Sequence, residues 1–130
     1  MQTAIKDLVV QKNLADKVVF HGLTDHVAHE LSKNDIFCLP SNYEGVPMTL
    51  IEAMASAMPI VATAVGGVPD MLVDGRDAFV CYNNVDDVSQ CLIKLIESQE
   101  LRETFGQNAL KRAYDFSSQK MAEKYMELYY

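Results

Sequence analysis

Two short apolar runs with a helical pattern between them constrain the fold of this chain most strongly. Residues 35–40 read DIFCLP and residues 59–65 read PIVATAV, and both are mostly apolar without alternation. Such runs are typical of strands that are buried on both faces of a sheet. Residues 48–57 have the apolar spacing of a helix. A strand, a helix and a strand in this order place the two strands parallel, because the helix crosses back over the sheet.

The same alternation extends to both ends of the chain. Residues 2–13 are predicted to be helical, KVVF at 17–20 and AFVCY at 78–82 are predicted to be strands, and 84–130 read as a helical tail. We therefore predict one α/β domain spanning 1–130. Its core is a parallel sheet of about four strands with helices on its faces.

The composition argues against several classes of partner. The 130 residues carry a formal charge of −7, which argues against nucleic acid or an anionic membrane surface as the main partner. No stretch reaches the ~20 apolar residues of a membrane span, and the start MQTAIKDLVV lacks the features of a signal peptide. A cytoplasmic location is therefore expected. The cysteines Cys38, Cys81 and Cys91 lack metal-binding spacing and are expected to be buried reduced thiols.

The loop after residues 35–40 carries the most informative side chain. Ligands of parallel sheets bind at the carboxyl ends of the strands, and this loop places Glu44 there. Gly45 allows a turn or a close approach to a ligand, and Pro47 suits the first position of a helix. The amides of the next three residues would then be unpaired and able to bind an anion: Met48, Thr49 and Leu50.

A second carboxylate, Glu52, lies about one turn into the predicted helix. Glu52 shares a helix face with Thr49, so Glu44 and Glu52 could flank one ligand and accept hydrogen bonds from paired hydroxyls. The alternative is purely structural, because the helix dipole favours acidic residues near helix starts in any protein.

Other candidate sites are weaker. The spacing of Val27 and Leu31 predicts a short helix after Thr24 or Asp25. His26 and His29 lie three residues apart on it, but no third ligand has suitable spacing, so no metal site is predicted and both are expected to be exposed. His21 follows a predicted strand and either faces the ligand cleft or is structural. Gly66 and Gly67 lack the spacing of a dinucleotide fingerprint and indicate a turn that lines the cleft.

The segment PSNYEGVPMTLIEAMASAMPIVATAVGGVPDMLVDG resembles the C-terminal domain of retaining glycosyltransferases with the GT-B architecture, in particular glycosyltransferase family 4. The resemblance rests on an ordered set of motifs: two glutamates with seven residues between them, then EAMA, PIVAT and GGVPD. It extends on both sides, from KVVFHG to the helical tail. It implies an enzyme that moves a hexosyl group from a nucleoside diphosphate sugar to an acceptor hydroxyl, with retention of configuration and without a metal ion or other cofactor.

The resemblance also implies roles for single residues. Glu44 matches the glutamate that lies at the donor sugar and is associated with catalysis, and Glu52 matches the one that holds the ribose hydroxyls. Leu23 and Thr24 match the region where the base packs. Ala57 stands where the family usually has glycine, and in a left-handed conformation this alanine would cost about 1 kcal/mol. The remaining matches form the loop and helix start that meet the sugar and the diphosphate: Gly45, Val46, Pro47, Met48, Thr49 and Leu50.

Family members carry more than the segment seen here. The resemblance implies that two further strands, an arginine and a lysine that clamp the diphosphate, and an N-terminal acceptor domain lie outside residues 1–130. We therefore expect a truncated C-terminal half of the GT-B fold, with a Rossmann-like parallel sheet, that is inactive alone. Its expected partners are a nucleotide sugar and either the N-terminal domain or a second chain, a homodimer included, and the intact enzyme could lie at the inner face of the membrane. The alternative is a non-catalytic fragment that serves as a binding or oligomerisation module.

Overall fold

The computed structural model describes residues 2–129 and shows the predicted alternation of helices and strands. The predicted helices at 2–13, at 48–57 and along the tail are confirmed within a few residues. None of the helices in the described part is both long and apolar enough to span a bilayer. In chain order the elements are α1 (Gln2–Gln11), α2 (Val27–Leu31), β1 (Phe37–Leu39), α3 (Met48–Ala55), β2 (Ile60–Thr63), α4 (Val68–Met71), β3 (Phe79–Cys81), α5 (Val85–Glu97), α6 (Gln99–Ala113), a 3-10 turn (Tyr114–Phe116) and α7 (Ser118–Tyr129).

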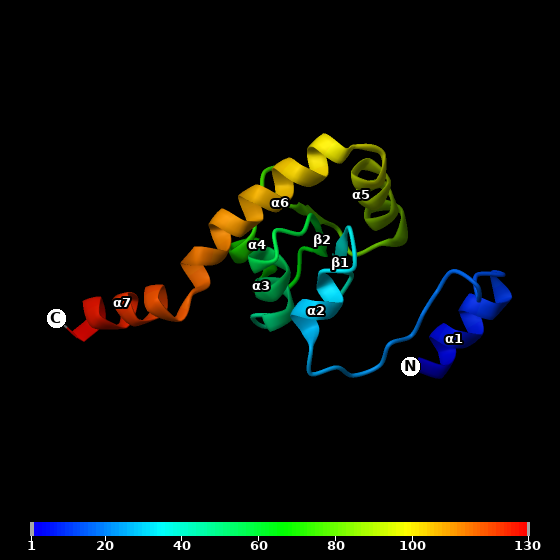
Figure 1. The fold of residues 1–130 in the computed structure, drawn as a ribbon, viewed down its shortest axis with the longest axis horizontal. Helices are drawn as coiled ribbons and strands as arrows, with labels where there is room; N and C mark the ends of the chain where they lie inside the picture. The colour runs from blue at the N-terminus through cyan, green and yellow to red at the C-terminus, as the bar shows by residue number, and fades with distance from the viewer. Residues whose placement is uncertain (1, 130) are drawn as a thin grey trace.

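The three strands form one parallel sheet in the order β1–β2–β3 (Figure 1). β2 is central, with Val61 in register with Cys38 of β1 and Phe79 of β3. All four residues of β2 are buried, because helices cover both of its faces. The prediction of a strand buried on both faces is therefore confirmed.

The two faces of the sheet belong to two hydrophobic clusters. On one face, Ile60 and Ala62 pack with residues of α3, α4 and α6. On the other face, Val61 packs with Leu95 of α5 and Phe105 of α6. α6 contributes to both clusters and thereby joins the two layers.

The three cysteines are free thiols in this second layer. Cys38, Cys81 and Cys91 are half-buried rather than buried as predicted, and they pack against the Val61 cluster. Burial, with a smaller contribution from the neighbouring Cys91, raises the pKa of Cys81 to about 11. Such a thiol carries little thiolate at neutral pH and is chemically inert.

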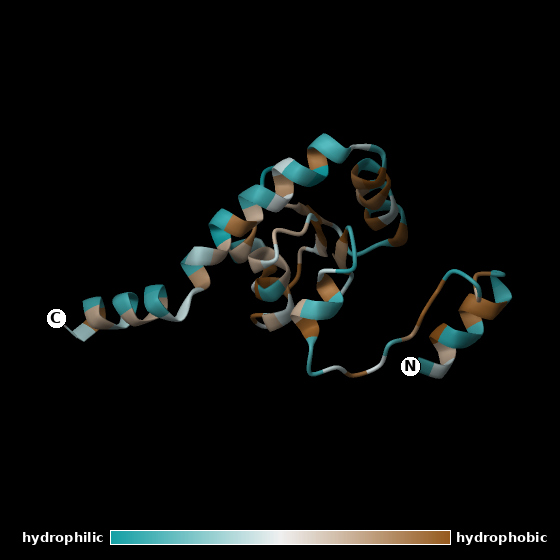
Figure 2. Ribbon diagram, viewed as in Figure 1, coloured by the Kyte–Doolittle hydropathy of each residue, from teal (hydrophilic) through white to brown (hydrophobic). Residues whose placement is uncertain are grey.

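The predicted strand at 17–20 is wrong, and residues 2–129 contain three strands rather than about four. Figure 1 shows α1 and the segment that leads from it to α2 away from the sheet, with no strand beside them. A strand is stabilised by hydrogen bonds to a neighbouring strand, and this segment has none. Val19 is 73% exposed, and Figure 2 shows further apolar residues of α1 and the following segment outside the packed body.

α3 ends in a Schellman motif with Ala57 at its left-handed position. The Met58 N–H donates to the Ala53 carbonyl (3.1 Å) and the Ala57 N–H donates to the Met54 carbonyl (3.0 Å). Ala57 has φ of 55°, the conformation for which glycine is usual at this position. The left-handed conformation considered at Ala57 is therefore confirmed.

Candidate functional site

Two successive hydrogen bonds fix Glu44 in the loop between β1 and α3. The Ser41 hydroxyl donates to a Glu44 carboxylate oxygen (2.5 Å), and the Thr63 hydroxyl donates to the Ser41 carbonyl oxygen (2.6 Å). Thr63 is completely buried at the end of β2. The position of Glu44 therefore depends on the neighbouring strand. Sequence reasoning missed Ser41 and Thr63, and the available signal was a polar residue at the end of an apolar strand.

The Gly66–Gly67 turn contacts the same loop from the end of β2. The Gly67 N–H donates to the Gly45 carbonyl (3.0 Å). Gly66 has φ of 54°, and a Cβ atom there would overlap the carbonyl oxygen of Glu44. Glycine is needed because the two backbones touch at this point. The predicted turn therefore packs directly against the loop that carries Glu44.

The start of α3 differs from the prediction in two details. Pro47 precedes the helix, with φ of −72° and ψ of 117°, instead of being its first residue. The Leu50 N–H donates to the Pro47 carbonyl (3.2 Å). This amide was predicted to be free, but it is paired because the first turn is tight. Within residues 2–129 the amides of Met48 and Thr49 have no partner, and both residues are exposed. The helix start therefore offers two free amides rather than three.

Glu52 lies half-buried on α3, one turn after Met48, and faces the start of α2. Its backbone carbonyl accepts from the Ser56 hydroxyl, whereas its carboxylate has no hydrogen-bond partner in the part of the chain that the structure describes. It lines a pocket of about 430 Å³ whose other lining residues are consecutive: Asp25, His26, Val27, Ala28 and His29. Glu44 does not line this pocket. The two glutamates therefore lie around the first turns of α3 without sharing one pocket.

Leu23 and Thr24, the predicted base-binding residues, lie just before this pocket. The Leu23 side chain is fully exposed. The Thr24 hydroxyl accepts from the His26 N–H (3.0 Å) and so supports the entry to α2. Neither residue lines the Glu52 pocket, whose wall begins at Asp25.

His21 and His26 precede α2, and His29 lies on it. His26 and His29 are exposed, as predicted. His21 lies 4.0 Å from Glu30 of α2 and does not line the Glu52 pocket. Among residues 2–129 no three His, Cys, Asp or Glu side chains are arranged to hold a metal ion.

Comparison with known proteins identifies the family of this chain. The family model described as glycosyl transferases group 1 matches residues 1–112. The N-acetyl-alpha-D-glucosaminyl L-malate synthase of Bacillus anthracis is 33% identical over 128 residues, which cover 97% of this chain and 34% of that protein. The MMP alpha-(1->4)-mannosyltransferase of Mycolicibacterium hassiacum is 34% identical over 127 residues, which cover 94% of this chain and 31% of that protein.

Solved structures match over nearly the whole chain. A variant of TarM from Staphylococcus aureus, solved with UDP, has a TM-score of 0.87 at 27% identity and covers 97% of this chain and 26% of its own. Sucrose-phosphate synthase from Thermosynechococcus elongatus has a TM-score of 0.83 at 26% identity and covers 96% of this chain and 33% of its own. The parallel sheet and its flanking helices therefore have the fold of the Rossmann-like C-terminal domain of GT-B enzymes.

The match is to part of that domain. The C-terminal domain of the group 1 protein LpcC from Francisella tularensis, at a TM-score of 0.73 and 24% identity, aligns over 87% of this chain and 60% of its own. This chain spans about a third of the length of the curated relatives named above. In sequence and in fold, the chain belongs to the group 1 glycosyl transferases.

Proposed function

We propose that this chain forms the donor-binding part of a retaining hexosyltransferase, which moves a sugar from a nucleoside diphosphate to an acceptor hydroxyl. The observation that carries the proposal is the fixed position of Glu44, which the Ser41 and Thr63 hydroxyls hold immediately before the open start of α3. A carboxylate held by a hydrogen bond a few residues before free helix amides suits a ligand that has both hydroxyls and phosphates. The structure of the TarM variant with UDP supports a nucleoside diphosphate as that ligand.

Each group has a separate task in this proposal. Glu44 accepts hydrogen bonds from the donor sugar. The free amides of Met48 and Thr49, at the positive end of the α3 dipole, stabilise the negative charge on the leaving diphosphate. Glu52 accepts hydrogen bonds from the ribose hydroxyls in the pocket beside α2, with Thr24 at the edge where the base packs. The family resemblance places an arginine and a lysine that bind the diphosphate outside residues 1–130, and the proposal includes no metal ion.

The proposal also includes further strands that add to the sheet at the open edge of β1. The Phe37 N–H donates to the Pro59 carbonyl (3.0 Å) on the β2 side. Because successive amides of a strand alternate in direction, the Cys38 amide faces the open edge of β1. Val19 and Phe20 are exposed on the segment that the sheet does not reach. An open strand edge and exposed apolar residues suit further parallel strands, supplied by more of the same protein or by another chain such as a second copy.

Ligand titration of the isolated chain tests the donor site. We expect at least one of UDP-, GDP- or ADP-glucose to bind in calorimetry. We expect Glu52→Ala to weaken that binding about tenfold, since it removes a charged hydrogen-bond acceptor. Glu103→Ala makes the same chemical change on an exposed position of α6 and should leave the affinity unchanged. Equal weakening by both variants, or no binding of any nucleotide, would contradict the donor site.

The same samples test whether the segment works alone. We expect no sugar transfer by residues 1–130. Measurable turnover would contradict the proposal that further strands or domains are needed for catalysis. A defined oligomer without nucleotide binding would favour the non-catalytic module instead. The exposed side chains of Met121, Tyr125 and Leu128 on α7 are the observation that keeps this alternative open.

A further inference from the structure

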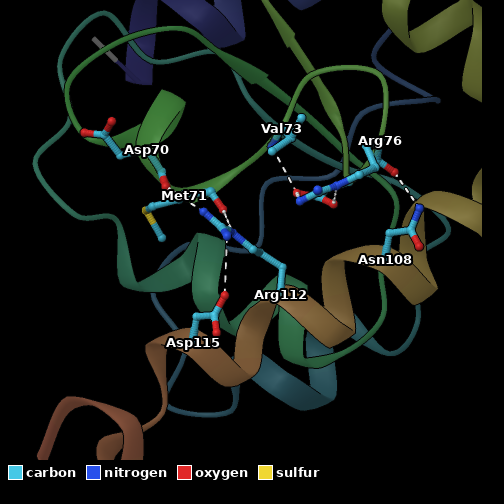
Figure 3. A network of polar contacts seen from close by, with 8 residues as sticks. Asp70, Met71, Val73, Arg76, Asn108, Arg112 and Asp115 are labelled. Atoms are coloured by element: carbon cyan, nitrogen blue, oxygen red, sulfur yellow. Dashed lines mark hydrogen bonds and ion pairs between the residues drawn. The ribbon is translucent and has the colours of Figure 1, made fainter. Parts of the chain in front are cut away.

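Arg112 connects α6 to the C-terminal end of α4 (Figure 3). Its Nε donates to the Met71 carbonyl (3.1 Å) and its Nη2 donates to the Asp70 carbonyl (3.1 Å). Its Nη1 lies 3.4 Å from a carboxylate oxygen of Asp115, and the guanidinium lies over the ring of Phe116. The carbonyls at the end of a helix have no partner within the helix. Arg112 therefore satisfies two of them at once and fixes the orientation of α4.

The other end of α4 contacts the loop that carries Glu44. Gly67, the residue before the helix, donates to the Gly45 carbonyl, and Gly66 lies directly against the Glu44 backbone. α4 has only four residues and is about 6 Å long at 1.5 Å per residue. A helix this short moves as a unit, so a displacement at Met71 also displaces the Gly66–Gly67 turn.

We propose that Arg112 is a positioning residue for Glu44: it fixes α4, and α4 fixes the loop. The inference rests on the proposed function, because it gives Arg112 a part in donor binding from the opposite end of α4. Val68 and Met71 of α4 are also buried in the core. Apolar packing is not directional, however, and the two hydrogen bonds from Arg112 restrict the rotation and sliding that such packing permits.

Asn108 provides a matched control one turn earlier on α6. Its side chain donates to the Arg76 carbonyl (2.8 Å) in the loop between α4 and β3. Burial alone would raise the pKa of Asp77 in this loop, but hydrogen bonds from Arg76 and from the Val73 N–H hold that pKa below its ordinary value. The loop thus has a charged contact of its own. Asn108 and Arg112 are both on α6 and both donate to backbone carbonyls, but only Arg112 donates to carbonyls of α4.

Amide hydrogen exchange on the full chain, measured by NMR, tests the positioning role without a ligand. The Gly67 amide reports the contact with the loop, and the amides of β2 report global stability. In Arg112→Ala we expect Gly67 exchange to accelerate about tenfold more than β2 exchange, because hydrogen bonds from a charged donor are lost. Arg112→Lys should restore part of the protection. Asn108→Ala should change Gly67 and β2 exchange by the same factor.

Affinity is the second readout, with whichever of UDP-, GDP- or ADP-glucose binds the unmodified chain. We expect Arg112→Ala to weaken binding about tenfold and Asn108→Ala by less than about twofold, in line with their different effects on the loop. The proposal is overturned if Gly67 exchange follows β2 exchange in Arg112→Ala, or if Asn108→Ala accelerates Gly67 exchange as strongly. If the unmodified chain binds no nucleotide, the proposed function fails, and the exchange experiment still decides whether Arg112 positions the loop.

Discussion

Ala57 has a backbone conformation that favours glycine. Its φ of 55° brings its Cβ close to the following carbonyl oxygen. The motif around it is made of backbone hydrogen bonds, so a change of side chain leaves those bonds intact. We therefore expect Ala57→Gly to raise the free energy of unfolding by about 1 kcal/mol in urea denaturation.

Ala55→Gly is the control for this substitution. Ala55 is the last residue of the same helix and is exposed, but its conformation is helical. Glycine there should lower the free energy of unfolding by about 0.5 to 1 kcal/mol. Destabilisation by both variants would show that Ala57 is not strained.

The candidate site could be predicted only where local chemistry decides. The helix start after Glu44 follows from neighbouring residues, and the structure shows it one residue later than predicted. The left-handed conformation of Ala57 was indicated by the family resemblance, and the structure shows it. The support of Glu44 does not follow, because the Thr63 hydroxyl reaches a carbonyl 22 positions earlier in the chain. Which carbonyl it meets depends on the register of β1 and β2, and no local pattern encodes that register.

The turn between β2 and α4 allows a test of close backbone contact. Gly66 and Gly75 both have positive φ, of 54° and 77°, so alanine at either position carries about 1–2 kcal/mol of strain. Only at Gly66 would a Cβ atom overlap a neighbour, the Glu44 carbonyl, whereas nothing lies within 4 Å of a Cβ at Gly75. We expect Gly66→Ala to cost at least about 1 kcal/mol more than Gly75→Ala in urea denaturation, as overpacking does elsewhere. Equal losses would show that the loop moves aside without cost.

The strands at 35–40 and 59–65 were predictable because each is a nearly continuous apolar run, and in the fold the two runs pair with each other. The run KVVF at 17–20 has the same composition but lacks a neighbouring strand, and hydrogen-bonded pairing decides whether a run becomes a strand. Propensity indicates where a strand can form. The partner that allows it to form lies elsewhere in the fold.

The molecule as a whole consists of a packed body from which two segments project, the N-terminal segment with α1 and, at the other end, α7, which has no buried residue (Figure 1). The body contains the sheet with α3, α4, α5 and α6. No residue of α1 is buried, and Figure 1 shows α1 apart from the sheet. A helix of ten residues is marginal in water without packing. The stability of the isolated chain should therefore come from the body alone.

Two leucines test this division with the same chemical change. Leu95 of α5 is completely buried and Leu8 of α1 is 48% exposed. We expect Leu95→Ala to lower the free energy of unfolding by about 2–5 kcal/mol, and Leu8→Ala to change it by less than about 0.5 kcal/mol. In hydrogen exchange, amides of residues 2–25 should exchange nearly as fast as in an unstructured peptide, while β2 and α6 stay protected. A large effect of Leu8→Ala, or protection of α1 equal to that of α6, would mean that the N-terminal segment folds with the body before any further strand joins the sheet.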